Sequence, residues 1–127
     1  MVSTAEFFDI EKIEQLRKLN GRELDGYDNF SWHVALFEDG ALSGVARLYR
    51  FDGGVMLDNP VLYKKNFSHS EVLFKTLMLK AVSSGFKNVY AFDDNGFITE
   101  FERYRDNIIK ADISHIKKLL CGGCNNC

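Results

Sequence analysis

The residue types best suited to chemistry gather just ahead of one predicted helix, which runs from about Ser68 to Ser84. This segment combines lysines, an asparagine, a histidine and serines, namely Lys64, Lys65, Asn66, Ser68, His69 and Ser70. The free amides and the dipole of a helix N-terminus attract anions, and serine hydroxyls can donate hydrogen bonds to phosphate oxygens. The pattern predicts a phosphate-binding site at the start of this helix.

The same segment has a second interpretation as a self-contained helix cap. Ser68 and Glu71 have the spacing of a capping box, in which the serine hydroxyl accepts from the Glu71 amide and the Glu71 carboxylate accepts from the Ser68 amide. A carboxylate in that position would repel a phosphate. The sequence leaves both interpretations open.

A second group of candidate residues stands at a strand end. Pro60, the one proline, closes a predicted strand two residues after Asp58. Proline has no amide hydrogen, so strand pairing must stop or bulge there. Asp58 beside such an opening is a candidate general base, acting directly or through water, although aspartates at strand ends are often turn residues. His33 lies within a predicted strand and is interpreted as a core side chain.

All three cysteines stand together at the C-terminal end, as Cys121, Cys124 and Cys127. The Cys-x-x-Cys-x-x-Cys spacing places three soft ligands within reach of one metal ion. A zinc site needs a fourth ligand, from His115, a partner or water. The alternative is a glycine- and asparagine-rich end whose thiols stay reduced.

The elements that must position these residues begin with a meander. Asp39-Gly40 and Asp52-Gly53-Gly54 are tight-turn signals. They separate three predicted antiparallel strands, over 31–37, 42–51 and 55–57. A first helix is predicted after Asp9 as its N-cap, with Ile10, Ile13 and Leu16 on its buried face.

The helix over 68–84 carries one apolar stripe, formed by Phe74, Leu77, Met78 and Ala81. A buried strand over 88–92 follows and completes a parallel strand–helix–strand unit. Val72 and Leu79 lie on the opposite side of the helix, where they either contact a second subunit in a homodimer or stay ordinary exposed residues. We also predict a short helix over 97–104 and a last strand over 107–113.

Composition narrows the class of protein. The chain has 127 residues, 46% of them apolar, which suits one domain over 1–120 followed by the cysteine-rich tail at 121–127. Sixteen basic and eighteen acidic residues leave a net charge of −2, which argues against nucleic acid as a partner. The sequence has neither a signal-peptide pattern nor a membrane-spanning run, so we expect a cytoplasmic protein.

The order of these elements resembles the GNAT superfamily of acetyl-CoA-dependent N-acetyltransferases. The resemblance covers about Phe7 to Asp106 and is carried by Glu23-Leu-Asp-Gly-Tyr-Asp28 and the strand Leu42-Ser-Gly-Val-Ala-Arg-Leu48. It implies an α/β (α+β) fold with a mixed, mostly antiparallel central sheet and helices on both faces. It also implies acetyl-CoA as cosubstrate and an amine of a small molecule or peptide as acceptor.

The resemblance places the cofactor on particular positions. The family's Arg/Gln-x-x-Gly-x-Gly/Ala loop aligns with Lys65 to Ser70, where Ser68 and Ser70 replace the two small residues. The pantetheine arm of the family lies where the sheet opens. The cofactor-binding residues implied are Asn59, Pro60, Val61, Lys64, Lys65, Asn66, Ser68, His69, Ser70 and Asn95.

The proton donor of the family aligns less well. The family tyrosine falls on Glu102, and Tyr104 is the nearest phenol, so the candidate catalytic residues are Asp58 as base and Tyr104 as acid. The alternative is a GNAT-like binding module without catalysis, using its surface or its cysteines to hold a partner or a metal.

Overall fold

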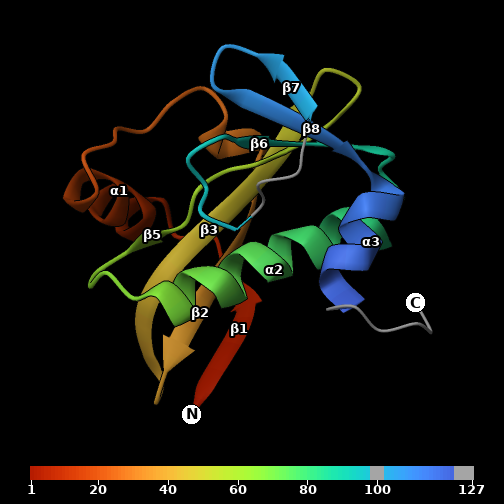
Figure 1. Ribbon diagram of the computed structural model, residues 1–127. Coiled ribbons are helices and arrows are strands. Elements are labelled where there is room, and N and C mark those ends of the chain that lie inside the picture. Colours follow the sequence, from red (N-terminus) through yellow and green to blue (C-terminus); the bar gives the residue numbers. More distant parts are fainter. Residues whose placement is uncertain (98–101, 122–127) are drawn as a thin grey trace.

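The computed structural model describes residues 1–97 and 102–121, without the side chain of Cys121. Within them a mixed sheet carries α1 on one face and α2 and α3 on the other (Figure 1), as predicted. The helices are α1 (Ile10–Leu19), α2 (Phe67–Ser83), α3 (Ile113–Cys121) and the 3-10 turn η1 (Asp28–Phe30). The strands are β1 (Val2–Glu6), β2 (Trp32–Glu38), β3 (Ala41–Phe51), β4 (Gly54–Leu57), β5 (Val61–Leu62), β6 (Asn88–Phe92), β7 (Glu102–Arg105) and β8 (Ile108–Asp112).

The strand order is β1-β2-β3-β4-β6-β8-β7, and β5 pairs with β3. The pairs are antiparallel except β4 with β6, which are parallel and joined by α2. The two predicted hairpins are confirmed. Asp39 and Gly40 have φ of 51° and 84°, and Asp52 and Gly53 have φ of 43° and 77°, which are the positive values that tight hairpin turns require.

Both faces of the sheet are covered by the predicted helical stripes. On α2, the side chains of Phe74, Leu77, Met78 and Ala81 are all buried, while Val72 and Leu79 are exposed. On α1, Ile13 and Leu16 are buried and pack against Val45 and Val61 of the opposite face. None of the described helices has the length and apolar content needed to cross a membrane.

Two terminal elements differ from the prediction. The sequence does not predict β1. This edge strand is exposed at all five residues, so it needs no alternation of apolar and polar side chains to signal it. The predicted helix over 97–104 is wrong for its last residues, since Glu102–Arg105 is β7 and pairs with β8; residues 98–101 lie outside the described part. After Asp112 the chain forms α3.

The sheet opens where Pro60 predicts a break. Leu57 is the last residue of β4 that pairs with β6, opposite Ala91. The chain then continues as β5, whose register on β3 is displaced by one residue, with Leu62 opposite Gly44. One extra residue between β4 and β5 is a bulge. It re-aims Asp58 and Asn59 away from the ladder between β4 and β6.

Candidate functional site

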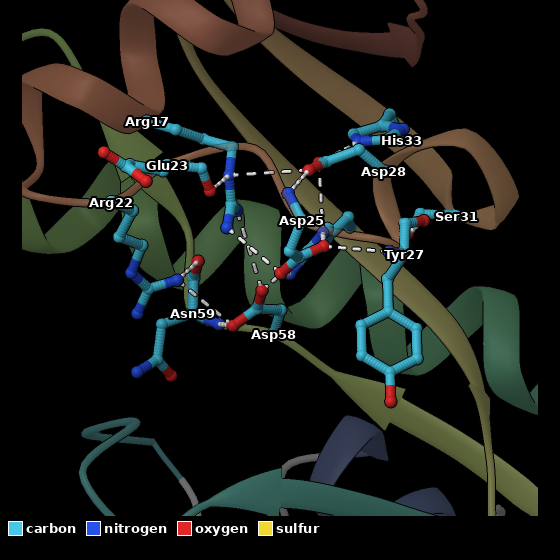
Figure 2. A network of polar contacts seen from close by, with 11 residues as sticks. Arg17, Arg22, Glu23, Asp25, Tyr27, Asp28, Ser31, His33, Asp58 and Asn59 are labelled. Atoms are coloured by element: carbon cyan, nitrogen blue, oxygen red, sulfur yellow. Dashed lines mark hydrogen bonds and ion pairs between the residues drawn. The ribbon is translucent and has the colours of Figure 1, made fainter.

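An ion-pair network lies beside this bulge and joins three parts of the chain (Figure 2). Its centre is Arg47 on β3. The guanidinium donates hydrogen bonds of 2.7–3.0 Å to three carboxylates, those of Asp25, Asp28 and Asp58. Arg47 is only 5% exposed and Asp58 only 3%, so the network belongs to the interior. It fixes the loop before β2 against the end of β4.

Two further arginines complete the network. Arg17 of α1 donates from Nε to the Glu23 carbonyl at 3.0 Å, and its Nη2 lies 3.5 Å from Asp25 Oδ2. Arg22 donates from Nη1 to Asp58 Oδ1 at 3.1 Å. Arg22 and Arg47 bond one oxygen each of Asp58, so this carboxylate serves two arginines at once.

The ion-pair network shifts the pKa values of Asp25 and Arg47. The hydrogen bond from Arg47 lowers the pKa of Asp25 to about 2. Burial alone would lower the pKa of Arg47, but the hydrogen bonds and charges of Asp25 and Asp58 outweigh it and raise that pKa above its ordinary value. Both groups are therefore charged at neutral pH. They form a fixed, oriented set of charges.

A cavity of about 250 Å³, which we call the network cavity, opens over these charges. Besides the network it is lined by Tyr49, Asn59, Phe92, Asp94 and Asn107. Asn59 follows the bulge, and Asp94 follows β6. The Asn59 Nδ2 donates to Asp94 Oδ1 at 2.9 Å, which links the two strand ends where the sheet has opened.

Tyr49 is a cavity residue that the sequence analysis missed. The residue is only 6% exposed. Its ring stacks on the ring of Tyr27, with the ring centroids 4.1 Å apart. Its hydroxyl has no hydrogen-bond partner among the described residues. Burial, reinforced by the charge of Asp58, raises the pKa of Tyr49 to about 12. The phenol therefore keeps its proton at neutral pH.

The N-terminus of α2 is capped by Asn66, whose Oδ1 accepts from the His69 amide at 3.1 Å. The capping-box alternative is wrong, because the helix begins at Phe67 and Ser68 lies inside its first turn, not at the N-cap. The first turn carries no acidic residue. A neutral cap leaves the positive end of the helix dipole free of a carboxylate, which is what an anion site requires.

A second cavity, of about 420 Å³, lies beside this helix start and is called the lysine cavity. Its lining includes Ser43, Tyr63, Lys64, Lys65, Asn66 and His69. Lys64 and Lys65 are exposed and offer their ammonium groups to a ligand. Glu38 also lines this cavity, and its Oε2 lies 3.6 Å from the His69 Nε2.

The other predicted site residues have varied surroundings. Val61 is buried against α1. Asn95 is buried and bonds its own turn, donating to the Phe92 carbonyl at 2.7 Å. Tyr104 packs on Tyr90 with centroids 4.9 Å apart and lines neither cavity. Cys124 and Cys127 lie outside the described residues, so the metal hypothesis for the tail stays a prediction.

We expect the stability of the protein to fall at both acid and alkaline pH. The pKa of Asp25 is about 2 in the folded state against an ordinary 3.8, so its contribution is complete above pH 3.8 and is lost as pH falls through 2. Because Asp25 is 41% exposed, we expect only about 1 kcal/mol from it. Urea unfolding across the acid range measures this loss.

The alkaline loss comes from Tyr49. Its folded pKa of about 12 exceeds the ordinary 10.0, so the stabilisation is complete below pH 10 and is lost as pH rises through 12. We expect about 2 kcal/mol. Urea unfolding of Tyr49→Phe should lack this loss, whereas Tyr63→Phe, at an exposed tyrosine, should keep it. Identical alkaline profiles for both variants would contradict the assignment.

Solved structures share this architecture. N-acetylglutamate synthase from Neisseria gonorrhoeae, solved with coenzyme A and N-acetyl-glutamate, matches at 22% identity and a TM-score of 0.59 over 72% of this chain. The chain spans only 25% of that protein. The ribosomal-protein-S18-alanine N-acetyltransferase from Escherichia coli matches at 10% identity and a TM-score of 0.65, covering 89% of this chain and 94% of its own.

An acetyltransferase of the GNAT family from Staphylococcus aureus matches at 10% identity and a TM-score of 0.59, over 89% of this chain and 99% of its own. No protein-family model matches the sequence. No curated protein matches it significantly. The likeness is therefore one of backbone architecture, and it agrees with the fold that the sequence predicts. The chain has the fold of the GNAT acetyltransferases.

Proposed function

We propose that this chain is an N-acetyltransferase that transfers the acetyl group of acetyl-CoA to a primary amine held in the network cavity. The observation that carries the proposal is the joint presence of two features. One is a helix start with a neutral cap, flanked by Lys64 and Lys65. The other is a charged cavity at the point where β4 and β6 separate.

The helix start suits the cofactor. The two phosphate groups of a CoA pyrophosphate fit the amides of the first turn of α2, with Ser68 and Ser70 as further donors. Lys64 and Lys65 supply the positive charge. A coenzyme A complex is known for the Neisseria synthase, which has the same fold.

The cavity suits the acceptor. In the transfer, the neutral amine nitrogen attacks the thioester carbonyl carbon, a C–N bond forms and the C–S bond breaks. The amine loses one proton, and the departing thiolate takes one up. Asp94 has a carboxylate at the cavity that is not held by an arginine, so it is better placed than Asp58 to accept the amine proton. Tyr49 is the protonated phenol that lines the cavity, whereas Tyr104 packs away from it.

Binding of the cofactor is the first test. At a hundredfold excess over Kd, acetyl-CoA or CoA should stabilise the protein by about 2.7 kcal/mol, which raises Tm by roughly 10 °C. Mass spectrometry of amine mixtures incubated with acetyl-CoA then detects the acetylated product. A thiol-specific dye is unsuitable, because the chain's own three cysteines would react with it.

A matched pair of variants checks where the cofactor binds. Lys65→Ala should raise the Kd for acetyl-CoA about fivefold by removing one ammonium near the phosphates. Lys87→Ala removes another exposed lysine, beyond the other end of α2, and should leave Kd unchanged. Absence of any stabilisation by either ligand would contradict the proposal and favour a binding module with this fold.

A further inference from the structure

The charges that line the network cavity indicate which class of acceptor it would bind. Three guanidiniums and three carboxylates line it, from Arg17, Arg22, Arg47, Asp25, Asp58 and Asp94. Five of these charges already pair with one another, through the contacts of Arg47 with Asp25 and Asp58, of Arg22 with Asp58 and of Arg17 with Asp25. The walls therefore have no excess of positive charge for a polyanion. With Asp28, which accepts a hydrogen bond from Arg47, four carboxylates stand against three guanidiniums, so the net charge of the group is negative.

One guanidinium keeps donors for a ligand. Arg22 uses Nη1 for Asp58 at 3.1 Å and for the Asn59 carbonyl at 3.5 Å. Its Nε and Nη2 donate no hydrogen bond within the described residues, and its side chain is 31% exposed. Figure 2 places this guanidinium at the edge of the network, beside Asn59. Two neighbouring N–H groups of an arginine match the two oxygens of one carboxylate.

One carboxylate keeps an acceptor. Asp94 accepts from Asn59 through Oδ1, and its Oδ2 has no partner among the described residues. This side chain is exposed and borders the same cavity as Arg22. A free carboxylate oxygen in this position suits an ammonium group. A donor pair and an acceptor thus line one small cavity.

The rest of the lining favours an apolar substituent on the ligand. The rings of Tyr49 and Phe92 form part of the wall. The Tyr49 hydroxyl bonds no described residue and is available to a polar group of the ligand. A volume of about 250 Å³ is at the small end for ligand sites, which fits a molecule of amino-acid size.

We infer that the acceptor is a free α-amino acid with an uncharged, apolar side chain, whose carboxylate binds Arg22 and whose amino group lies against Asp94. This inference rests on the proposed acetyl transfer. The α-amino nitrogen loses a proton and forms the C–N bond, the thioester C–S bond breaks, and the product is the N-acetyl amino acid with free CoA. A diamine would leave Arg22 without its carboxylate and add a second positive charge.

The test compares acceptors that differ in one group. Leucine and phenylalanine should be acetylated with kcat/KM at least tenfold above leucinamide, glutamate and a diamine, as measured by mass spectrometry with saturating acetyl-CoA. Leucinamide keeps the amine and the side chain of leucine but lacks its carboxylate. Equal kcat/KM for leucine and leucinamide, or preference for the diamine, would overturn the inference.

Variants separate recognition from folding. Arg22→Gln should raise KM for leucine at least tenfold with little change in kcat, should leave KM for leucinamide unchanged, and should be partly rescued by Arg22→Lys. Arg50→Gln, at an exposed arginine of β3, is the matched control and should change neither value. An equal rise of KM for both substrates in Arg22→Gln would reveal a structural role only and overturn the carboxylate assignment.

The failure of this inference is distinguishable from failure of the proposed function. Stabilisation by acetyl-CoA with acetylation of some other amine would overturn the acceptor class and leave the acetyl transfer in place. Absence of stabilisation by acetyl-CoA and CoA would contradict both.

Discussion

Replacing Arg47 by alanine is expected to lower the free energy of unfolding by about 3–5 kcal/mol, the largest single effect that we predict. The change removes one guanidinium that three aspartates share, two of them almost fully buried. Asp28 and Asp58 would then be buried charges with too few partners, which costs more than the loss of an equivalent apolar contact. Urea unfolding followed by circular dichroism measures the change.

The control is Arg50→Ala on the same strand, where the guanidinium is exposed and lies over the Phe86 ring at 5.1 Å. That variant should lose about 1 kcal/mol or less. Arg47→Lys keeps the charge but not the forked geometry, so its stability should fall between the two. If Arg47→Ala and Arg50→Ala were equally stable, the network would not hold the fold together as described.

Ser68→Asp is expected to weaken acetyl-CoA binding tenfold or more while stabilising the protein slightly. An aspartate in the first turn of α2 interacts well with the helix dipole, for a gain of about 0.5 kcal/mol. The same carboxylate would repel the phosphates that we place there. Isothermal titration for Kd and urea unfolding for stability give the two quantities on one protein sample.

Ser84→Asp places the same charge at the C-cap of α2. It should lose a little stability, because a negative charge is unfavourable at that end of the dipole, and Kd should stay at its original value. Weaker acetyl-CoA binding together with higher stability in Ser68→Asp would show that the binding is not lost through loss of folding. Unchanged Kd in that variant would remove the α2 N-terminus from the cofactor site.

The parts of the fold that follow local rules were predictable. Two turns with an aspartate and a glycine at positive φ define the hairpins, and the stripe from Phe74 to Ala81 defines the buried face of α2. β1 was not predictable, since all five of its residues are exposed and its pairing with β2 depends on contacts distant in sequence. β7 has the same character, with three of its four residues exposed.

The site was only partly accessible from the sequence. Asp58 was identified from its place beside Pro60, Asn59 through the resemblance, and the lysines from their place ahead of α2. The role of Arg47 was not foreseen, because a charged residue within a strand normally points to solvent, and nothing local reveals that Asp25 and Asp28 approach it from another loop. The resemblance did contain the signal, since its two segments carry Arg47 and both of these aspartates.

The bulge after β4 limits which residues of the network cavity can be replaced without unfolding the protein. Arg47 and Asp58 both stabilise the fold and line the network cavity, so replacing them to suit a new acceptor would destabilise the protein. Asn107 at the rim is exposed and has neither that double role nor the proton transfer assigned to Asp94. A mutant library restricted to Asn107 should therefore yield altered acceptor preference in clones that remain folded, whereas randomising Arg47 and Asp58 should yield mostly insoluble ones.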